Sequence, residues 1–143
     1  MQKASRISRK PDQRGAAMVE GALVLSLFLF LVIGIIDFGQ LMFVHQSLTN
    51  RAGAGARYAA VRTFDAEAAR NVVLYGTANP NDSARPAFGL TAANVNVELQ
   101  DSNTDYPRVV LTISGYRYHF ISPLLARIAT GRPITISLPY EQP

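Results

Sequence analysis

Two carboxylates, Glu20 and Asp37, lie at the two ends of a long apolar stretch of this sequence. An ionised carboxylate beside hydrocarbon is unfavourable unless it is paired, and acids at membrane depth usually have partners. The chemistry that these side chains suggest is therefore ion pairing at the edges of an apolar layer. Glu20 lies five residues after Gly15 and directly behind a basic tail, so it is the acid that most needs an explanation.

Catalytic chemistry has little support elsewhere in the chain. The two histidines, His45 and His119, have no further ligand at metal-binding spacing, and the sequence has no cysteine. Serine, aspartate and histidine are present, but no nucleophile elbow or metal motif accompanies them. We therefore expect no catalytic residue, no metal site, no cofactor and no enzymatic activity.

The basic charge is confined to the N-terminus. The 143 residues have a formal net charge of +4, and residues 1–15 carry all of it, with five basic side chains against one acidic side chain. The rest of the chain is neutral, with nine arginines against nine acidic residues. Because nucleic-acid-binding domains gather basic residues on one face, we expect no nucleic-acid partner.

The apolar stretch is long enough to cross a membrane. Residues 21–36 carry no charge, and the apolar character resumes after Asp37. A helix over residues 16–44 would be about 43 Å long, whereas the hydrocarbon core of a bilayer is about 30 Å thick. We predict a leader at 1–15, a transmembrane helix at 16–44 and a domain at 45–143. Basic residues are denser before the helix than after it, so the leader should be cytoplasmic and the domain extracytoplasmic.

Asp37 lies about 26 Å beyond Glu20 along such a helix, at a rise of about 1.5 Å per residue. This distance places Asp37 near the opposite membrane interface. It either marks the place where the membrane ends, or it is partly buried and paired with an arginine or an amine of another helix.

Three interpretations of the N-terminus compete. A cleaved secretory signal has an apolar segment of about 7–15 residues followed by a small-x-small site. Here the apolar segment is longer, and the nearest such tripeptides, around residues 52–56, lie well past its end. An uncleaved anchor explains the apolar helix but neither Gly15 nor Glu20. A leader cut between Gly15 and Ala16 explains both, because the freed α-amino group of Ala16 is a natural partner for Glu20.

The residues GAAMVE, from Gly15 to Glu20, resemble a type IV prepilin signal. Such signals have a basic leader that ends in glycine, a cut, and a glutamate at the fifth mature position before a long apolar helix. The resemblance implies that a prepilin peptidase cuts between Gly15 and Ala16. It also implies that Glu20 makes an assembly contact with the amine of a neighbouring subunit.

The longer stretch from Gly15 to Arg62 is similar to the N-terminal region of the TadE-like family, which comprises pseudopilins of the tight-adherence (Tad/Flp) pilus systems. The shared features are the glutamate that opens the helix, Asp-Phe-Gly near its far end, and AGARYA at residues 54–59. The sequence departs from the family at Gly21, where an aromatic residue is common, and at Ser26, where many members have a proline that kinks the helix.

This resemblance implies a minor pilin-like subunit or an assembly factor of a Tad-type pilus, because the major pilins of these systems are much shorter. The implied partners are the bacterial inner membrane, the prepilin peptidase, other pilin-like subunits and the Tad assembly machinery. The alternative is an uncleaved, single-pass envelope protein whose extracytoplasmic domain is an interaction module.

Small residues recur at three- and four-residue spacing after the predicted span, a pattern that is typical of a closely packed helix. The residues in question are Ala52, Gly55, Ala56 and Ala59. Their helix packs either against its own domain or against another subunit. A short helix over residues 65–75 and a loop over residues 76–89 should follow.

Three stretches of alternating apolar residues predict antiparallel strands, at 94–100, 108–116 and 134–140. A short helix is predicted between Pro123 and Gly131. A three-stranded sheet with one apolar face needs a cover, and the helix that continues from the span can provide it. We therefore expect a pilin-like α+β fold.

Overall fold

The computed structural model describes residues 13–118, 120–122 and 130–141. The helices are α1 (Gln13–Ala60) and α2 (Ala66–Tyr75), and two single 3-10 turns are η1 (Ala87–Gly89) and η2 (Ala92–Asn94). The strands are β1 (Val95–Gln100), β2 (Arg108–Ile113) and β3 (Ile134–Pro139). Most of the predicted leader, His119 and the helix predicted from Pro123 lie outside the described residues. The chain divides into two units, Met1–Ile36 and Asp37–Pro143, and each is described by itself.

The described part of the first unit is the N-terminal half of α1, whose large apolar side chains are exposed. Within the described residues, one helical stretch, Gly15–Ala60, is long and apolar enough to cross a membrane. Its most apolar 18 residues have a mean hydropathy of 2.6, and none of them is buried. A helix that is apolar on all sides is either buried in a core or spans a membrane, so this exposure favours a membrane anchor.

The helix begins at Gln13, three residues before the predicted start at Ala16. Once a helix has formed, each added residue gains a hydrogen bond, so α1 extends back through Arg14 and Gly15. Where many TadE-like proteins have a proline, the Ser26 hydroxyl donates a hydrogen bond to the carbonyl oxygen of Ala22 at 2.8 Å. The backbone of α1 therefore continues through this position.

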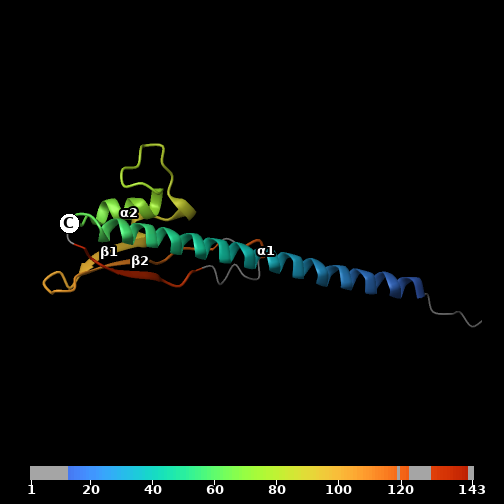
Figure 1. Ribbon diagram of the computed structural model, residues 1–143. Coiled ribbons are helices and arrows are strands. Elements are labelled where there is room, and N and C mark those ends of the chain that lie inside the picture. The colour runs from blue at the N-terminus through green and yellow to red at the C-terminus, as the bar shows by residue number, and fades with distance from the viewer. Residues whose placement is uncertain (1–12, 119, 123–129, 142–143) are drawn as a thin grey trace, which may run out of the picture. The chain divides into compact units, whose positions relative to one another are not determined.

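In the second unit, α1 and α2 lie on one face of a three-stranded antiparallel sheet in the order β1-β2-β3 (Figure 1). Val97, Leu111 and Ile136 are paired across the three strands and point toward the helices. The sheet therefore buries one face, as the alternating apolar residues predicted. All three strands and the α+β class are confirmed.

The short helix α2 is defined by its two ends. The Asp65 carboxylate accepts hydrogen bonds from the backbone N–H groups of Glu67 and Ala68, at 2.9 and 3.0 Å, so that two otherwise unpaired donors are satisfied. At the other end Gly76 adopts φ 81° and donates its N–H to the carbonyl oxygen of Val72 at 2.9 Å. This left-handed conformation is costly for any residue except glycine, so it fixes the end of the helix.

The segment after β3 returns to the end of α1. The backbone N–H of Glu141 donates to the carbonyl oxygen of Ala60 at 2.9 Å, and the Tyr140 hydroxyl accepts a hydrogen bond from the N–H of Phe64 at 3.2 Å. The last carbonyls of a helix have no partner within the helix. Here a residue 81 positions later in the sequence satisfies one of them.

Gly55 lies where α1 approaches α2 and β2 most closely. A Cβ atom there would lie 2.5 Å from Cγ2 of Val73 and 3.0 Å from the carbonyl oxygen of Ala69. A Cβ at Gly53 on the same helix would meet nothing closer than 3.4 Å, at the flexible end of Arg57. The two glycines therefore have the same chemistry but different surroundings.

We expect Gly55→Ala to lower the free energy of unfolding of the domain by up to about 2 kcal/mol, because an overpacking cost of about 1–3 kcal/mol is offset only in part by a gain in helix propensity of about 1 kcal/mol. Gly53→Ala should gain the same helix propensity without steric overlap, so it should raise the free energy of unfolding by up to about 1 kcal/mol. Denaturant unfolding of the full chain in detergent, followed by tyrosine fluorescence, measures both. Equal effects of the two substitutions would contradict the close packing at Gly55.

Candidate functional site

The residues of the predicted processing site lie at the start of α1. Gly15 and Ala16 are in its first turn, Glu20 follows one turn later, and all three are exposed. The predicted boundary between the leader and the helix, at residues 15 and 16, therefore lies inside α1 and not at its start. The first N–H groups of a helix have no intrahelical partner and glycine is a weak helix former, so this turn can unwind at low cost.

Glu20 forms no ion pair with any residue that the structure describes. Its carboxylate lies on the exposed surface of the first unit, among apolar side chains such as Val24 and Phe28. Pairing of Glu20 with the amine of a neighbouring subunit stays a prediction.

Asp37 is the buried acid of the second unit. Its side chain is fully buried, and its two carboxylate oxygens accept hydrogen bonds from the backbone N–H groups of Ile121 and Ser122, at 2.8 and 3.0 Å. The partners are therefore backbone amides of the same subunit, not the arginine or amine of another helix that the sequence analysis considered. Hydrogen bonds from N–H groups to a carboxylate stabilise a buried charge. Asp37 thus fixes residues 121–122 against α1.

The sequence carried a signal for the burial of Asp37. Asp37 precedes Val44 by seven positions and Leu48 by eleven, so all three lie on one stripe of α1. Leu48 is fully buried and Val44 packs against the core. The partners at residues 121–122 could not be found in this way, because a backbone amide has no side-chain signature.

The small residues of α1 pack inside the second unit. Ala52, Ala56 and Ala59 are at most 1% exposed, and Gly55 lies against α2 and β2. Of the two arrangements considered for this stripe, the structure has the one in which the helix packs against its own domain. With these residues already covered, a contact with another subunit would have to use a different surface.

An apolar groove of about 410 Å³, here called the aromatic groove, lies beside the first turns of α1 in the second unit. Its wall contains four aromatic rings, from Phe43, Phe88, Tyr118 and Phe120, and one cation, Arg117. The rings of Phe43 and Phe88 meet edge to face with centroids 6.2 Å apart, and those of Tyr118 and Phe120 are 5.9 Å apart. The sequence analysis missed this groove because its residues come from three separate segments.

Tyr116 is a buried residue of the core, and its ring contacts the ring of Tyr118. Its hydroxyl donates to the carbonyl oxygen of Arg132 at 2.9 Å and lies 3.3 Å from the Tyr118 hydroxyl. Burial raises the pKa of Tyr116 well above its usual range, and the hydrogen bond with Tyr118 raises it further, so the phenol stays neutral. The ring also occupies the space beside Gly131, where any Cβ would overlap with it. The small size of Gly131 thus makes room for Tyr116, and most of the helix predicted between Pro123 and Gly131 lies outside the described residues.

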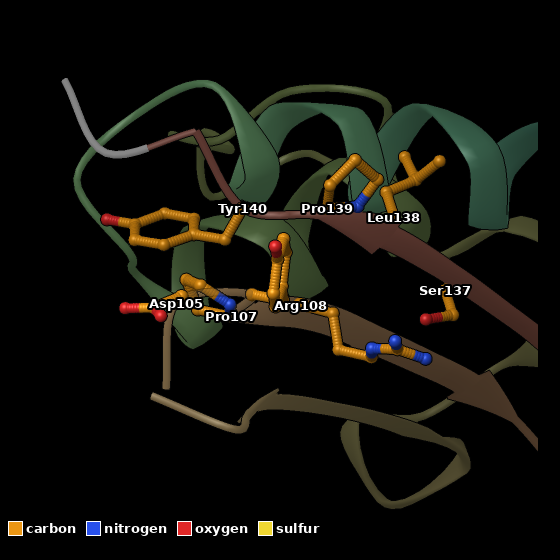
Figure 2. A pocket seen from close by; sticks show the side chains of 8 residues that line it. Asp105, Pro107, Arg108, Ser137, Leu138, Pro139 and Tyr140 are labelled. Carbon is orange, nitrogen blue, oxygen red and sulfur yellow. The ribbon is translucent and has the colours of Figure 1, made fainter. Parts of the chain in front are cut away.

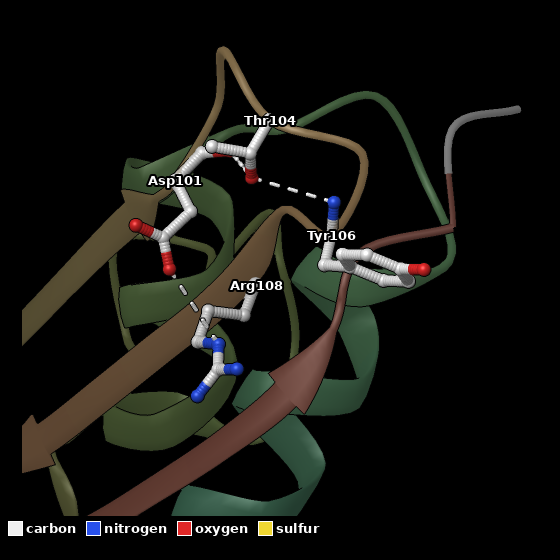
Figure 3. Close-up of polar contacts among 4 residues, drawn as sticks. All are labelled: Asp101, Thr104, Tyr106 and Arg108. Atoms are coloured by element: carbon white, nitrogen blue, oxygen red, sulfur yellow. Dashed lines mark hydrogen bonds and ion pairs between the residues drawn. The ribbon is translucent and has the colours of Figure 1, made fainter.

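A second hollow, of about 460 Å³, lies between the loop that joins β1 to β2 and the end of β3 (Figure 2). Asp105, Pro107 and Arg108 line it on one side and Tyr140 on the other. Nearby, the guanidinium of Arg108 lies 3.7 Å from the carboxylate of Asp101, in a pair with both side chains about half exposed (Figure 3). Exposed pairs contribute little to stability, so we assign this hollow no chemistry.

The turn before Arg108 is held by Thr104. Its backbone N–H and its hydroxyl both donate to the carbonyl oxygen of Asp101, at 3.0 and 2.8 Å, and the hydroxyl accepts from the N–H of Tyr106 at 3.3 Å (Figure 3). These bonds allow Asp101 to adopt φ 56°, an uncommon conformation that aspartate tolerates better than most residues. The loop is therefore an ordered turn between strands.

Comparison with known proteins identifies the N-terminal third of the chain. The family model described as "TadE-like protein" matches residues 15–57, which confirms the resemblance over that segment. The match includes Gly15, Glu20, Asp37 and most of the small-residue stripe. The searches of curated proteins and of solved structures find no match.

Proposed function

Because residues 15–57 match the TadE-like family, we propose that this protein is a minor pilin-like subunit, a pseudopilin, or an assembly factor of a Tad-type pilus. The observation that carries the proposal is α1, which begins with an uncovered apolar half and ends as the core helix of an α+β domain. The first half is suited to a bilayer and the second half to a folded domain. The family match and this helix together support a single-pass, membrane-anchored protein.

In this proposal α1 anchors the protein in the bacterial inner membrane, with the leader in the cytoplasm and the domain outside. A prepilin peptidase cuts between Gly15 and Ala16, after which Glu20 pairs with the new amine of a neighbouring pilin-like subunit. The protein then acts with the Tad machinery in tight adherence, as a structural component without an enzymatic reaction of its own.

We expect Gly15→Leu to block processing, because the peptidase must fit an unwound Gly15–Ala16 bond and a leucine side chain occupies space that glycine leaves free. The precursor should stay in the membrane at its full mass, whereas the mature wild type should begin at Ala16. Intact-mass measurement and N-terminal sequencing of the membrane fraction give the result.

Gly34→Leu is the matched control. Gly34 lies in the same helix with open space around it, and it is far from the cut. This variant should be processed normally. Full processing of the Gly15→Leu variant would contradict a cut that depends on Gly15. A wild-type protein that keeps its full mass would instead support the uncleaved envelope anchor, the alternative that the sequence leaves open.

A further inference from the structure

The second unit carries exposed apolar side chains next to the end of the predicted span. Phe38 and Phe43 on α1 are each 65% exposed, and Ile121 is 59% exposed. Asp37 contributes no exposed charge here, because it is buried and bonded to the N–H groups of residues 121 and 122. The start of this unit therefore presents an apolar surface of its own.

The length of α1 that precedes the aromatic groove indicates that the groove begins at the edge of a bilayer. Residues 16–36 form about 31 Å of helix, enough for a hydrocarbon core of about 30 Å. Residues 37–41 add about 7 Å, and each headgroup layer is about 5–7 Å thick, half of the difference between the full bilayer of about 40–45 Å and its core. The first turn of the second unit, which includes Gln40 and Leu41 of the groove, would therefore lie in the headgroup layer, where tyrosine and tryptophan are enriched.

The groove combines an apolar wall with a single cation. Its volume of about 410 Å³ lies within the range of small-molecule pockets. Arg117 lines it with an exposed side chain that makes no ion pair with any described residue. A guanidinium binds phosphate oxygens through two parallel hydrogen bonds, and anionic lipids attract basic groups at the membrane surface.

We propose that the aromatic groove binds a phospholipid of the leaflet from which α1 emerges, preferentially an anionic one. An acyl chain lies against Phe43, Phe88 and Phe120, and the phosphate binds Arg117. The proposal requires α1 to span a membrane, but it does not require the protein to enter a pilus. Its failure can therefore be distinguished from failure of the proposed function, which the processing of Gly15 tests.

The test uses the full chain in nanodiscs that contain phosphatidylglycerol with a photoreactive acyl chain. Illumination followed by peptide mass spectrometry locates the lipid adducts. Any transmembrane helix labels along its span, so the informative adducts are those at Phe88 and Tyr118, which lie outside α1. We expect adducts at these two residues in addition to residues 16–44.

Arg117→Gln should reduce the Phe88 adduct on the order of tenfold or more, the effect of losing one charged hydrogen-bonded contact. Arg117→Lys keeps the charge but loses the bidentate hydrogen bonding of the guanidinium, so it should give an intermediate yield of the Phe88 adduct. Arg62→Gln is the matched control, because Arg62 stacks over Tyr58 at 4.9 Å, away from the groove, and should leave the yield unchanged.

Two results would overturn the proposal. Adducts confined to residues 16–44 would mean that no lipid enters the groove, as when another protein chain covers it. An equal Phe88 adduct in the Arg117→Gln and Arg62→Gln variants would mean that Arg117 does not hold the phosphate.

Discussion

Replacing Asp37 with alanine should release residues 121 and 122 from α1. The carboxylate is fully buried and accepts their two backbone N–H groups at 2.8 and 3.0 Å. A hydrogen bond to a charged group contributes about 1.5–3 kcal/mol, and two part-buried ones are lost together, so local opening should become easier by on the order of 3 kcal/mol, or about a hundredfold. Hydrogen exchange of Ile121 and Ser122, measured by mass spectrometry on the full chain in detergent, should accelerate by that factor.

Asp65 provides the control for this experiment. Its carboxylate also accepts two backbone N–H groups, those of Glu67 and Ala68, but Asp65 is exposed. Water can replace the lost acceptor there, so Asp65→Ala should cost only about 1 kcal/mol. Asp37→Asn keeps one acceptor oxygen and should fall between the wild type and Asp37→Ala. Unchanged exchange at residues 121 and 122 in Asp37→Ala would leave Asp37 only as a marker of the membrane edge.

Replacing Glu20 with glutamine should abolish pili while the protein remains in the membrane and is at least partly cut. If Glu20 pairs with the amine of a neighbouring subunit in a low-dielectric setting, loss of one partner costs on the order of 3–5 kcal/mol. The affinity between neighbouring subunits would then fall by roughly two to three orders of magnitude. Insertion should not suffer, because a carboxylate near hydrocarbon is itself unfavourable. Pili counted by electron microscopy, and co-purification of other pilins, measure the effect.

Glu98→Gln is the matched control, since Glu98 is an exposed acid on β1 and should be replaceable without loss of pili. Glu20→Ala tests whether the shape of the side chain contributes beyond its charge. Normal pili with both Glu20 variants would show that the acid is merely tolerated, and the pseudopilin proposal would lose its main mechanistic support.

The elements of the fold could be predicted because their signals are local. Alternation of apolar residues identified β1, β2 and β3, and an acid-rich start followed by a loop rich in glycine and proline identified α2. The start of α1 at Gln13 was less predictable, because helix ends fray. The features that escaped prediction depend on distant contacts: the amides that hold Asp37, the ring of Tyr116 beside Gly131, and the convergence of Phe43 with Phe88.

The candidate site also has one part that the local sequence reveals and one part that depends on distant contacts. Gly15, Ala16 and Glu20 form a pattern within six residues, which the sequence displays directly. The aromatic groove draws on α1, on η1 and on the segment after β2, and no spacing rule connects residues 43, 88 and 117. Only the folded chain brings them together.

The hydrogen bond between Glu141 and Ala60 has a consequence for the order in which this protein can be made. Synthesis completes α1 first, but Leu48, Ala52 and Ala56 gain their cover only when the strands form, and β3 begins about 75 residues later. At about 5–20 residues per second this delay is on the order of 4–15 s. Throughout that interval the helix can already be in the membrane while Leu48, Ala52 and Ala56 are still exposed. A chaperone that binds these three residues would then meet them only on newly made chains.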